Sequence, residues 1–422
     1  MVIQAGEVRS PRGEPLRVLA IGNIYPPHAP GGGYELTWRS AVEHLRDRGD
    51  EVRILTSEHR EPGVRPAAVE DPDVHRELPW YWRDHAFPRR GLRERVRLER
   101  RAAAVLERHL REFKPHVVNW WGMGAMPLGL VERVRLAGIP AVGVVGDEWI
   151  VWGPKVDAWT RLCRKLRAAA PLAGRLAKLP TDVDLGSAGT WLFNSDEVRR
   201  RSLARSPLGD ARVEHPGIDE HLFRPAPAHD RWHWRLLCLG RMDERKGAHV
   251  AVEALPHLPR ATLVLQGRGD PAYVERLERR ADELGVRERV HFLAAPRERL
   301  AEVYADADVT LFPVQWDEPW GLVPLEAMAV GRPVIATGTG GSAEYLRHED
   351  NCLVYTPRNS PRDLARAVER LAADPALRAR LRDGGLATAP RFTERRYNEA
   401  IAAALDEASG ACREDRHYAA AP

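Results

Sequence analysis

The sequence predicts an α/β protein made of two doubly wound, Rossmann-like domains that face each other across an inter-domain cleft. The chain of 422 residues is too long for a single hydrophobic core, which favours two domains. Short apolar runs alternate with longer amphipathic runs, as strands and helices do in a parallel sheet covered on both faces. This alternation stops once, in the proline-rich stretch VEHPGIDEHLFRPAPAHD, and then restarts.

The first domain is expected over residues 1–214. Its predicted strands are short runs rich in apolar and β-branched residues, separated by charged helical sequence. They span 16–22, 51–57, 116–121, 140–145 and 191–195. A glycine-rich loop follows the first strand and leads into a helix predicted over 33–48.

A linker is expected at 215–230 and the second domain at 231–392. The predicted strands of the second domain span 235–241, 261–267, 289–293, 308–314, 332–338 and 351–357. Residues 393–422 are expected to form a C-terminal helix and a tail. One interpretation is that this helix packs back on the first domain. Because ligands of such folds bind beyond the carboxyl ends of the strands, two facing domains would place the site in the cleft between them.

Composition narrows the function classes. The charged fraction of 29% and net charge of +4 are those of an ordinary globular protein, and no basic stripe interleaved with aromatic residues indicates nucleic acid. The four cysteines show no paired spacing, which argues against disulfides or a zinc site and favours a reducing compartment. The N-terminus lacks the apolar core of a secretion signal, and no apolar run has the length of a membrane span. A cytoplasmic location is therefore expected.

The stretch EPWGLVPLE places two carboxylates, Glu318 and Glu326, around a predicted helix start. The free backbone N–H groups near Gly321, Leu322 and Val323 would give that helix start a phosphate-binding end. A carboxylate accepts hydrogen bonds and does not donate them, so the two glutamates suit the hydroxyls of a sugar or a ribose. Taken alone, the pair has a structural alternative, in which one glutamate caps a turn and the other stabilises the helix.

Two further segments predict anion binding. GRMDERKG follows the first strand of the second domain and carries Arg241 and Lys246, a planar fork and a point charge that together suit a diphosphate. In the first domain, Gly31, Gly32 and Gly33 precede a helix and let the backbone approach a ligand closely. Taken alone, Arg241 and Lys246 could instead be solvated surface cations that bind no ligand. Opposed domains that each present an anion site imply a nucleotide diphosphate linked to a polyol.

These motifs together resemble those of the retaining glycosyltransferases of family 4, which have the GT-B fold. The resemblance rests on GR-x4-KG, E-P-W-G-L-x3-E, TGTGGSAEYL and NCLVYTPRNSPRDLARAVERL, and it covers the second half of the chain more fully than the first. It implies transfer of a sugar from a nucleotide sugar to an acceptor hydroxyl with retention of anomeric configuration and without a cofactor. The acceptor is left open as a glycan, a lipid-linked molecule or a small molecule.

The resemblance also implies roles for individual residues. Arg241, Lys246 and Glu318 would be catalytic, the two cations on the donor's diphosphate and the glutamate on a hydroxyl of the transferred sugar. Glu326 would hold the ribose hydroxyls. The remaining donor contacts would come from the backbone of Gly32, Gly33, Gly321, Leu322 and Val323.

One position departs from the family pattern. Gly146, in VVGDEWIVWG, stands where many relatives carry a histidine beside the reacting sugar. Asp147 and Glu148 are candidates for part of that role on the acceptor side, or caps of the next helix, and Asn119 is a further acceptor-side candidate. The departure keeps two alternatives open, a catalytically silent sugar-nucleotide-binding protein and a nucleotide-sugar epimerase of similar fold.

Two D-x-D patterns, at 182–184 and 306–308, invite a metal-site interpretation. Such acid pairs belong to a different glycosyltransferase architecture, and Asp306 and Asp308 are interpreted as structural. Arg241 and Lys246 already supply the positive charge that a metal ion would bring to a diphosphate. No metal requirement is therefore predicted.

The segment 155–178 carries seven basic residues and one acid, with leucines and a tryptophan at near-helical spacing around Pro171. A basic amphipathic helix of this kind can lie on an anionic membrane surface, which would make the protein peripheral at the inner face of the membrane. The alternative, which the sequence favours, is an excursion of the first domain that covers its own cleft and holds the acceptor.

Overall fold

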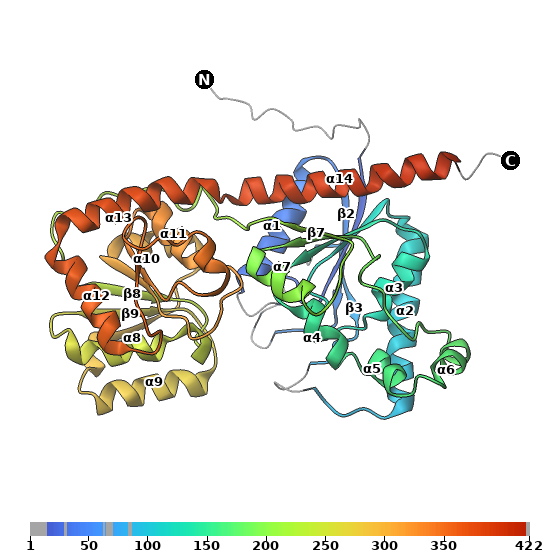
Figure 1. Ribbon diagram of the computed structural model, residues 1–422, viewed down its shortest axis with the longest axis horizontal. Coiled ribbons are helices and arrows are strands. Elements are labelled where there is room, and N and C mark those ends of the chain that lie inside the picture. Colours follow the sequence, from blue (N-terminus) through green and yellow to red (C-terminus); the bar gives the residue numbers. More distant parts are fainter. Residues whose placement is uncertain (1–14, 29–31, 62–63, 65–70, 83–86, 419–422) are drawn as a thin grey trace, which may run out of the picture. The chain divides into compact units, whose positions relative to one another are not determined.

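The structure of the protein is a computed structural model that describes residues 15–28, 32–61, 64, 71–82 and 87–418, with side chains described as far as Gly410. The chain separates into two compact units, Met1–Glu214 with Asn398–Pro422 and His215–Tyr397. Each unit contains one parallel sheet with helices packed on it (Figure 1). The position of Gly31 in the predicted glycine loop lies outside the described residues.

The sheet of the first unit has seven parallel strands in the order β3-β2-β1-β4-β5-β6-β7. Its strands are β1 Arg17–Gly22, β2 Glu51–Ser57, β3 Val74–Leu78, β4 Val117–Trp120, β5 Ala141–Val145, β6 Thr190–Phe193 and β7 Asp210–Val213. Its helices are α1 Gly33–Asp47, α2 Leu92–Phe113, α3 Gly129–Leu136, α4 Trp149–Val156, α5 Ala158–Lys165, α6 Ala170–Ala177 and α7 Asp196–Leu203. Helix α14, Glu394–Tyr418, begins in the second unit and continues into the first.

The sheet of the second unit has six parallel strands in the order β10-β9-β8-β11-β12-β13. Its strands are β8 Arg235–Leu239, β9 Thr262–Gln266, β10 Val290–Leu293, β11 Val309–Phe312, β12 Val334–Ala336 and β13 Leu353–Val354. Its helices are α8 Ala248–Ala254, α9 Pro271–Glu283, α10 Leu300–Asp306, α11 Leu322–Val330, α12 Pro361–Ala373 and α13 Pro375–Thr388. In both sheets the chain starts in the middle, moves to one edge, and then crosses to the other side, as in a Rossmann fold.

The predicted strands all form, within a few residues of their expected ends. The structure adds two strands that the sequence analysis missed, β3 (VHREL) and β7 (DARV). Both are outermost strands of the first sheet and most of their residues are half-buried. An edge strand packs against one neighbouring strand only and tolerates charge, so it lacks the apolar run by which buried strands are recognised.

The segment predicted as a linker, 215–230, is packed within the second unit. Ile218 forms a parallel bridge with Thr393, and its N–H donates to the carbonyl of Phe392 at 3.0 Å. A Cβ atom at Gly217 would lie 2.1 Å from the carbonyl carbon of Thr393, so only glycine permits this approach. These contacts hold the start of the segment against residues 392–393 of the same unit.

The segment 155–178 does not form the single helix that its spacing suggested. It contains the end of α4 and two short helices, α5 and α6. Asp157 caps α5 by accepting from the N–H of Thr160 at 2.7 Å, and Pro171 lies in the first turn of α6, where a missing N–H costs nothing. In the part of the chain that the structure describes, no helix combines the length and the apolar character needed to cross a membrane.

Helix α14 is held in the first unit by a buried charge network. The Arg48 guanidinium donates to both oxygens of the Asp406 carboxylate at 3.0 and 3.1 Å, and it also contacts Asp50 at 2.8 Å. All three side chains are at most 10% exposed. Asn398 adds a hydrogen bond to Ser40 at 2.7 Å. Residues after Tyr397 thus complete the first unit, although they follow the second in the sequence.

We expect Arg48→Ala to lower the free energy of unfolding by about 3 kcal/mol, because it leaves two buried carboxylates without their cation. The matched control is Arg39→Ala, which removes an exposed i,i+4 pair with Glu43 and should cost less than ~1 kcal/mol. The measurement is chemical or thermal unfolding of the full-length variants. Equal losses for the two variants would contradict this account of how α14 is held.

Candidate active site

The candidate site lies where the strand order of the second sheet reverses. β8 and β11 are hydrogen-bonded neighbours, with Leu236 opposite Val309 and Leu237 opposite Thr310. Because the two strands are parallel, the loops that follow them, 240–247 and 313–321, leave the sheet at the same edge. In doubly wound folds this switch point beyond the carboxyl ends of the strands is where ligands bind.

Glycine brings the two loops into contact. Gly247 has φ of 73°, and a Cβ atom there would lie 1.8 Å from the carbonyl oxygen of Pro313. Close by, the N–H of Gln315 donates to the carbonyl of Arg245 at 2.7 Å. The second glycine of the GR-x4-KG motif, Gly247, is thus needed both for its backbone conformation and for this close approach. The loop after β8 is thereby fixed against the loop after β11.

The predicted donor residues Lys246 and Glu318 meet across these loops. The Lys246 ammonium donates to Oε2 of Glu318 at 2.7 Å, and the indole N–H of Trp316 donates to the same oxygen at 2.8 Å. The two ionised side chains are 22% and 10% exposed. The carboxylate is therefore held in place by two donors, and the ammonium lies beside it at the edge of the sheet. The sequence analysis missed Trp316. Its position two residues before Glu318 is the feature of the sequence that could have identified it.

Arg241 lies on the same loop as Lys246 and is oriented by Asp243. The Arg241 Nε–H donates to the Asp243 carboxylate at 2.7 Å, and Arg245 donates to it at 3.2 Å. Burial raises the pKa of Asp243, but the bonds to the two arginines outweigh it and hold the pKa below its usual value. Asp243 therefore stays ionised and keeps the Arg241 guanidinium at the loop, 39% exposed.

Helix α11 begins directly after the loop that follows β11. Gly321, at the N-cap position, has φ of 88°, and a Cβ atom there would lie 2.8 Å from the ring of Phe312. Its carbonyl accepts from the hydroxyl of Tyr345 at 2.5 Å. Leu322 and Val323 follow in the first helical turn, so their N–H groups lie at the positive end of the helix.

Glu326 is positioned differently from Glu318. It is 6% exposed, and its Oε2 accepts from the hydroxyl of Tyr304, on α10, at 2.6 Å. Burial raises its pKa, although Arg297 at 4.0 Å and the bond to Tyr304 oppose the shift. The structure thus brings Lys246 and Glu318 together and holds Arg241 on the loop of Lys246, while Tyr304 of α10 holds Glu326. To bind ribose hydroxyls it would have to share or exchange the bond to Tyr304.

The glycine loop of the first unit forms the N-terminus of α1. Gly32 is its N-cap residue and Gly33 its first residue. A Cβ atom at Gly32 would lie 2.0 Å from a carboxylate oxygen of Glu35, which lies over the helix start. Gly32 therefore gives room to an acidic side chain of the same turn.

The side-chain position at Gly146 is occupied by a tyrosine. A Cβ atom at Gly146 would lie 2.4 and 2.5 Å from two ring carbons of Tyr34, whose hydroxyl donates to the carbonyl of Val144 at 2.7 Å. The ring also packs against Trp121, with centroids 5.5 Å apart. The departure from the family pattern therefore has a physical counterpart, because Tyr34 fills the space into which a histidine at position 146 would project.

The acceptor-side candidates lie in three different environments. Asp147 is exposed, and its Oδ1 accepts from the N–H of Trp149 at 2.8 Å, which caps the start of α4. Glu148 pairs with Arg201 on α7 at 3.4 Å. Asn119 is 1% exposed, and its amide bonds the carbonyl of Val142 and the indole of Trp121. The prediction for Asn119 is not supported, because both ends of its amide are engaged inside the first unit.

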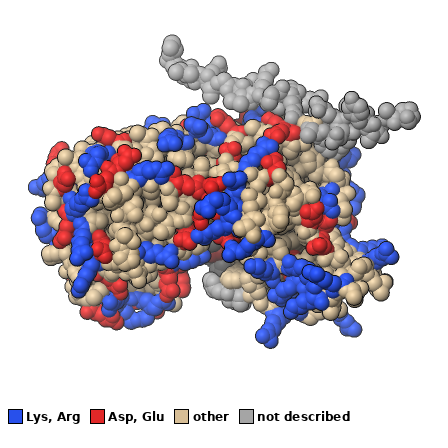
Figure 2. Space-filling view, in the orientation of Figure 1, with Lys and Arg blue, Asp and Glu red and all other residues tan. Residues whose placement is uncertain are grey.

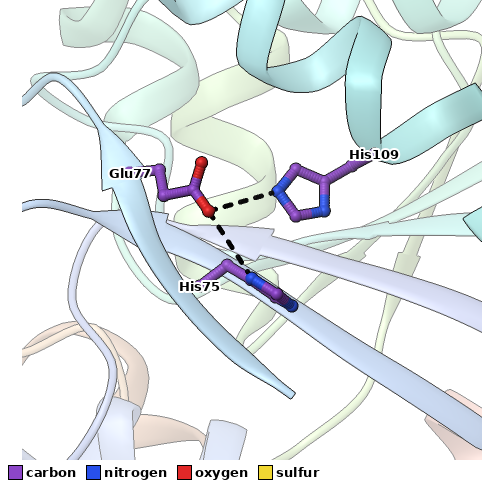
Figure 3. A group of neighbouring side chains, drawn as sticks. All are labelled: His75, Glu77 and His109. Carbon is purple, nitrogen blue, oxygen red and sulfur yellow. Dashed lines mark ion pairs between the residues drawn. The ribbon is translucent and has the colours of Figure 1, made fainter. Parts of the chain in front are cut away.

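The structure also contains a His-Glu-His cluster that the sequence analysis missed (Figure 3). Glu77 on β3 lies 3.5 Å from His75 and 3.7 Å from His109 on α2. Arg108 forms an ion pair with the same carboxylate. Burial, then the neighbouring His75 and Arg108, lower the pKa of His109 to about 4 despite the nearby Glu77. Arg108 therefore supplies the cation that Glu77 needs, and the cluster joins α2 to the edge strand.

The acids of the second D-x-D pattern hold the start of β8. Asp308 is 5% exposed, and its Oδ2 accepts from the backbone N–H groups of His233 and Arg235 at 3.0 and 2.8 Å. Its other oxygen is 2.9 Å from Nδ1 of His229. Asp306 forms an ion pair with Arg235. These contacts agree with the structural role expected of both aspartates.

The segment that carries the β8 and β11 loops is similar to known proteins. The profile of the family described as "Glycosyl transferases group 1" matches residues 220–387, which include the β8 and β11 loops. A D-inositol 3-phosphate glycosyltransferase of Streptomyces bingchenggensis is 33% identical over 246 residues, 53% of each chain. A GDP-mannose-dependent alpha-(1-6)-phosphatidylinositol monomannoside mannosyltransferase of Mycobacterium tuberculosis is 36% identical over 277 residues, 60% of this chain and 66% of its own length. The matches thus span about half to two thirds of these relatives.

Solved structures identify the fold. Sucrose-phosphate synthase from Thermosynechococcus elongatus matches with a TM-score of 0.70 at 22% identity, over 92% of this chain and 97% of its own. HepE of Anabaena, in complex with UDP and glucose, matches with a TM-score of 0.67 at 21% identity, over 92% and 99% of the two chains. The predicted GT-B fold, with two parallel Rossmann-like sheets, is confirmed.

We expect Gly146→His to lower the stability of the protein by about 1–3 kcal/mol, because the new side chain would overlap the Tyr34 ring. The same substitution should cost less in a Tyr34→Ala background, where that space is vacated, so the two changes should not be additive. Thermal unfolding of the two single variants and the double variant measures this. An equal cost of Gly146→His in both backgrounds would show that Tyr34 does not occupy the position.

Proposed function

Because the chain belongs to the glycosyl transferases group 1 family, we propose that it moves a sugar from a nucleotide-diphosphate donor to an acceptor hydroxyl with retention of anomeric configuration. The observation that carries the proposal is the contact between the Lys246 ammonium and the Glu318 carboxylate at 2.7 Å. It places a cation for phosphate and an acceptor for sugar hydroxyls side by side at the switch point of the second sheet.

We assign the diphosphate of the donor to Arg241 and Lys246. An ammonium group has three donors, so Lys246 can retain its bond to Glu318 and still donate to a phosphate oxygen. Arg241, which Asp243 holds through its Nε–H, would direct the other side of its guanidinium to the same diphosphate. The N–H groups at the start of α11 would add partial positive charge. Glu318 would accept from a hydroxyl of the transferred sugar.

These groups stabilise the charge that develops during the reaction. The bond between the anomeric carbon and the diphosphate oxygen breaks, and the leaving diphosphate gains negative charge beside Arg241 and Lys246. The acceptor oxygen forms its bond to the anomeric carbon on the same face. Its proton passes to the departing diphosphate oxygen, so a strong base from the protein is not needed. The two cations supply the positive charge that this step requires, and we expect no metal requirement.

We place the acceptor in the first unit. The residues that support this are Asp147 and Glu148 at the start of α4. Gly32 and Gly33, at the start of α1, stay assigned to the donor through their backbone. The named relatives indicate polyol and glycan acceptors, since one is named for D-inositol 3-phosphate and another for a phosphatidylinositol monomannoside. One solved relative was crystallised with UDP-glucose and one sequence relative is named for GDP-mannose. Cysteine usage favours a reducing compartment, so we place the reaction in the cytoplasm.

The direct test is incubation of the full-length protein with UDP-glucose or GDP-mannose, with and without excess EDTA, followed by detection of free nucleoside diphosphate. Water then takes the sugar in place of the acceptor, so release is slow hydrolysis of the donor. The proposal predicts that one of the two donors releases its nucleoside diphosphate, and that EDTA does not change the rate of release. A donor at a hundredfold over its dissociation constant should also raise the stability of the protein by about 2.7 kcal/mol. Stabilisation without release would indicate a silent binding protein, the alternative that Gly146 keeps open. A change of sugar configuration without acceptor would indicate an epimerase.

Replacing the central cation tests the site itself. We expect Lys246→Ala to reduce turnover by about 10²–10³-fold, because it removes a charge aimed at the leaving diphosphate. Arg279→Ala, at an exposed position on α9 of the same unit, is the control and should leave turnover unchanged. Retention of most of the wild-type rate by Lys246→Ala, with wild-type thermal stability, would contradict the assignment.

A further inference from the structure

Helices α2, α5 and α6 of the first unit present apolar side chains to solvent. Leu92, Leu166, Leu172 and Leu176 are 57, 55, 63 and 73% exposed. They are four of the seven exposed large hydrophobic side chains in the part of the chain that the structure describes. A single exposed leucine needs no explanation, but several gathered on neighbouring helices mark an interaction surface.

Three of these leucines, Leu92, Leu166 and Leu176, line a groove of about 300 Å³, and Leu172 lies on α6 beside them in the sequence. Six of the apolar side chains that line it are Leu92, Val96, Trp159, Leu162, Leu166 and Leu176. The groove is thus shared by α2, α5 and α6, and its only charged lining residue is Arg100. We call the groove, the four exposed leucines and the basic residues described next the α2–α5–α6 surface.

The elements that form the groove also carry exposed positive charge. The exposed basic residues of this surface include Arg93, Arg97, Arg161, Lys165, Arg167 and Arg175. Figure 2 shows lysines and arginines gathered over α5 and α6 without acidic side chains among them. The only acid of residues 155–178 is Asp157, which is 1% exposed and caps the N-terminus of α5.

The surface is held firmly by the rest of the first unit. Besides capping α5, Asp157 accepts from the N–H of Leu128 at 3.0 Å. The indole N–H of Trp159 donates to the carbonyl of Pro180 at 2.6 Å. The Arg100 guanidinium donates to the carbonyls of Ala177 and Leu176 at 2.8 and 3.0 Å. The leucines therefore stay exposed on a fixed frame and do not belong to a loose loop that could fold over them.

We propose that the α2–α5–α6 surface docks on an anionic phospholipid bilayer, with its leucines at the acyl boundary and its basic residues on the lipid phosphates. Charge complementarity selects this occupant. A second copy of the chain would bring the same positive charge against itself, and a nucleic acid would meet the cations but leave the leucines in water. A lipid surface satisfies both the apolar groove and the exposed basic residues of the same helices. The inference does not depend on the sugar-transfer reaction proposed above.

The sequence favoured the other interpretation of 155–178, an excursion that covers the domain's own cleft. That interpretation requires the apolar side chains of the segment to be buried by protein. Trp159 and Cys163 are buried, at 2% and 4% exposure, but the three leucines that follow are more than half exposed. The segment therefore uses one side to pack on α2 and leaves the other side for a partner.

The test is flotation of the full-length protein with vesicles of phosphatidylcholine containing phosphatidylglycerol, and with vesicles of phosphatidylcholine alone, at physiological salt. We expect binding to the anionic vesicles only. The apolar variant Leu172→Gln/Leu176→Gln should bind them roughly a hundredfold more weakly, at about tenfold per leucine. The basic variant Lys165→Gln/Arg167→Gln/Arg175→Gln should weaken binding by on the order of a hundredfold, at about fivefold per charge.

Matched controls lie in the second unit. Leu293→Gln removes a leucine that is 41% exposed on β10, and Arg279→Gln/Arg299→Gln/Arg362→Gln removes three exposed charges. Both should bind like the wild type. Failure of the wild type to float with anionic vesicles would overturn the proposal, as would full binding by the apolar variant. A dimer in solution that the apolar variant dissociates would also overturn it, by assigning the surface to a second copy. The rate at which a nucleotide sugar releases its nucleoside diphosphate, measured without vesicles, should be the same in all variants.

Discussion

The contact between Lys246 and Glu318 is the interaction on which the account of this protein depends. It joins two residues that are 72 positions apart in the sequence and brings opposite charges together at the switch point of a parallel sheet. The pairing of β8 with β11 makes the contact possible, and the absence of a side chain at Gly247 lets the loops approach closely enough. Trp316 then fixes the carboxylate from a second direction. The sheet, the glycine and the indole each serve the same small cluster.

Much of this arrangement was predictable from the sequence, for identifiable reasons. Buried parallel strands require continuous apolar runs, so the strands next to the site were located within a few residues. Charged residues in the loops after such strands lie at one edge of the sheet, and this reasoning located the contact between Lys246 and Glu318. The convergence of Arg241 with these two residues stays a prediction. The edge strands β3 and β7 were missed because their sequences carry the charges that an edge tolerates.

Tertiary contacts decided what the sequence could not. Asn119 follows a strand and looks available, yet its amide is used entirely inside the first unit. Glu326 has the spacing of a ligand-binding residue, but its carboxylate bonds Tyr304 on another helix. Gly146 appeared as a missing histidine, whereas the structure shows that Tyr34, far away in the sequence, fills the space. In each case the deciding neighbour comes from a distant part of the chain and leaves no local signal.

The most direct measurement is a structure of the protein with a nucleotide sugar bound. The account predicts the Lys246 ammonium and the Arg241 guanidinium about 3 Å from oxygens of the diphosphate, with the Glu318 carboxylate accepting from a hydroxyl of the sugar. A nucleotide sugar seated away from the loops that follow β8 and β11, with Lys246 and Glu318 touching neither diphosphate nor sugar, would contradict it.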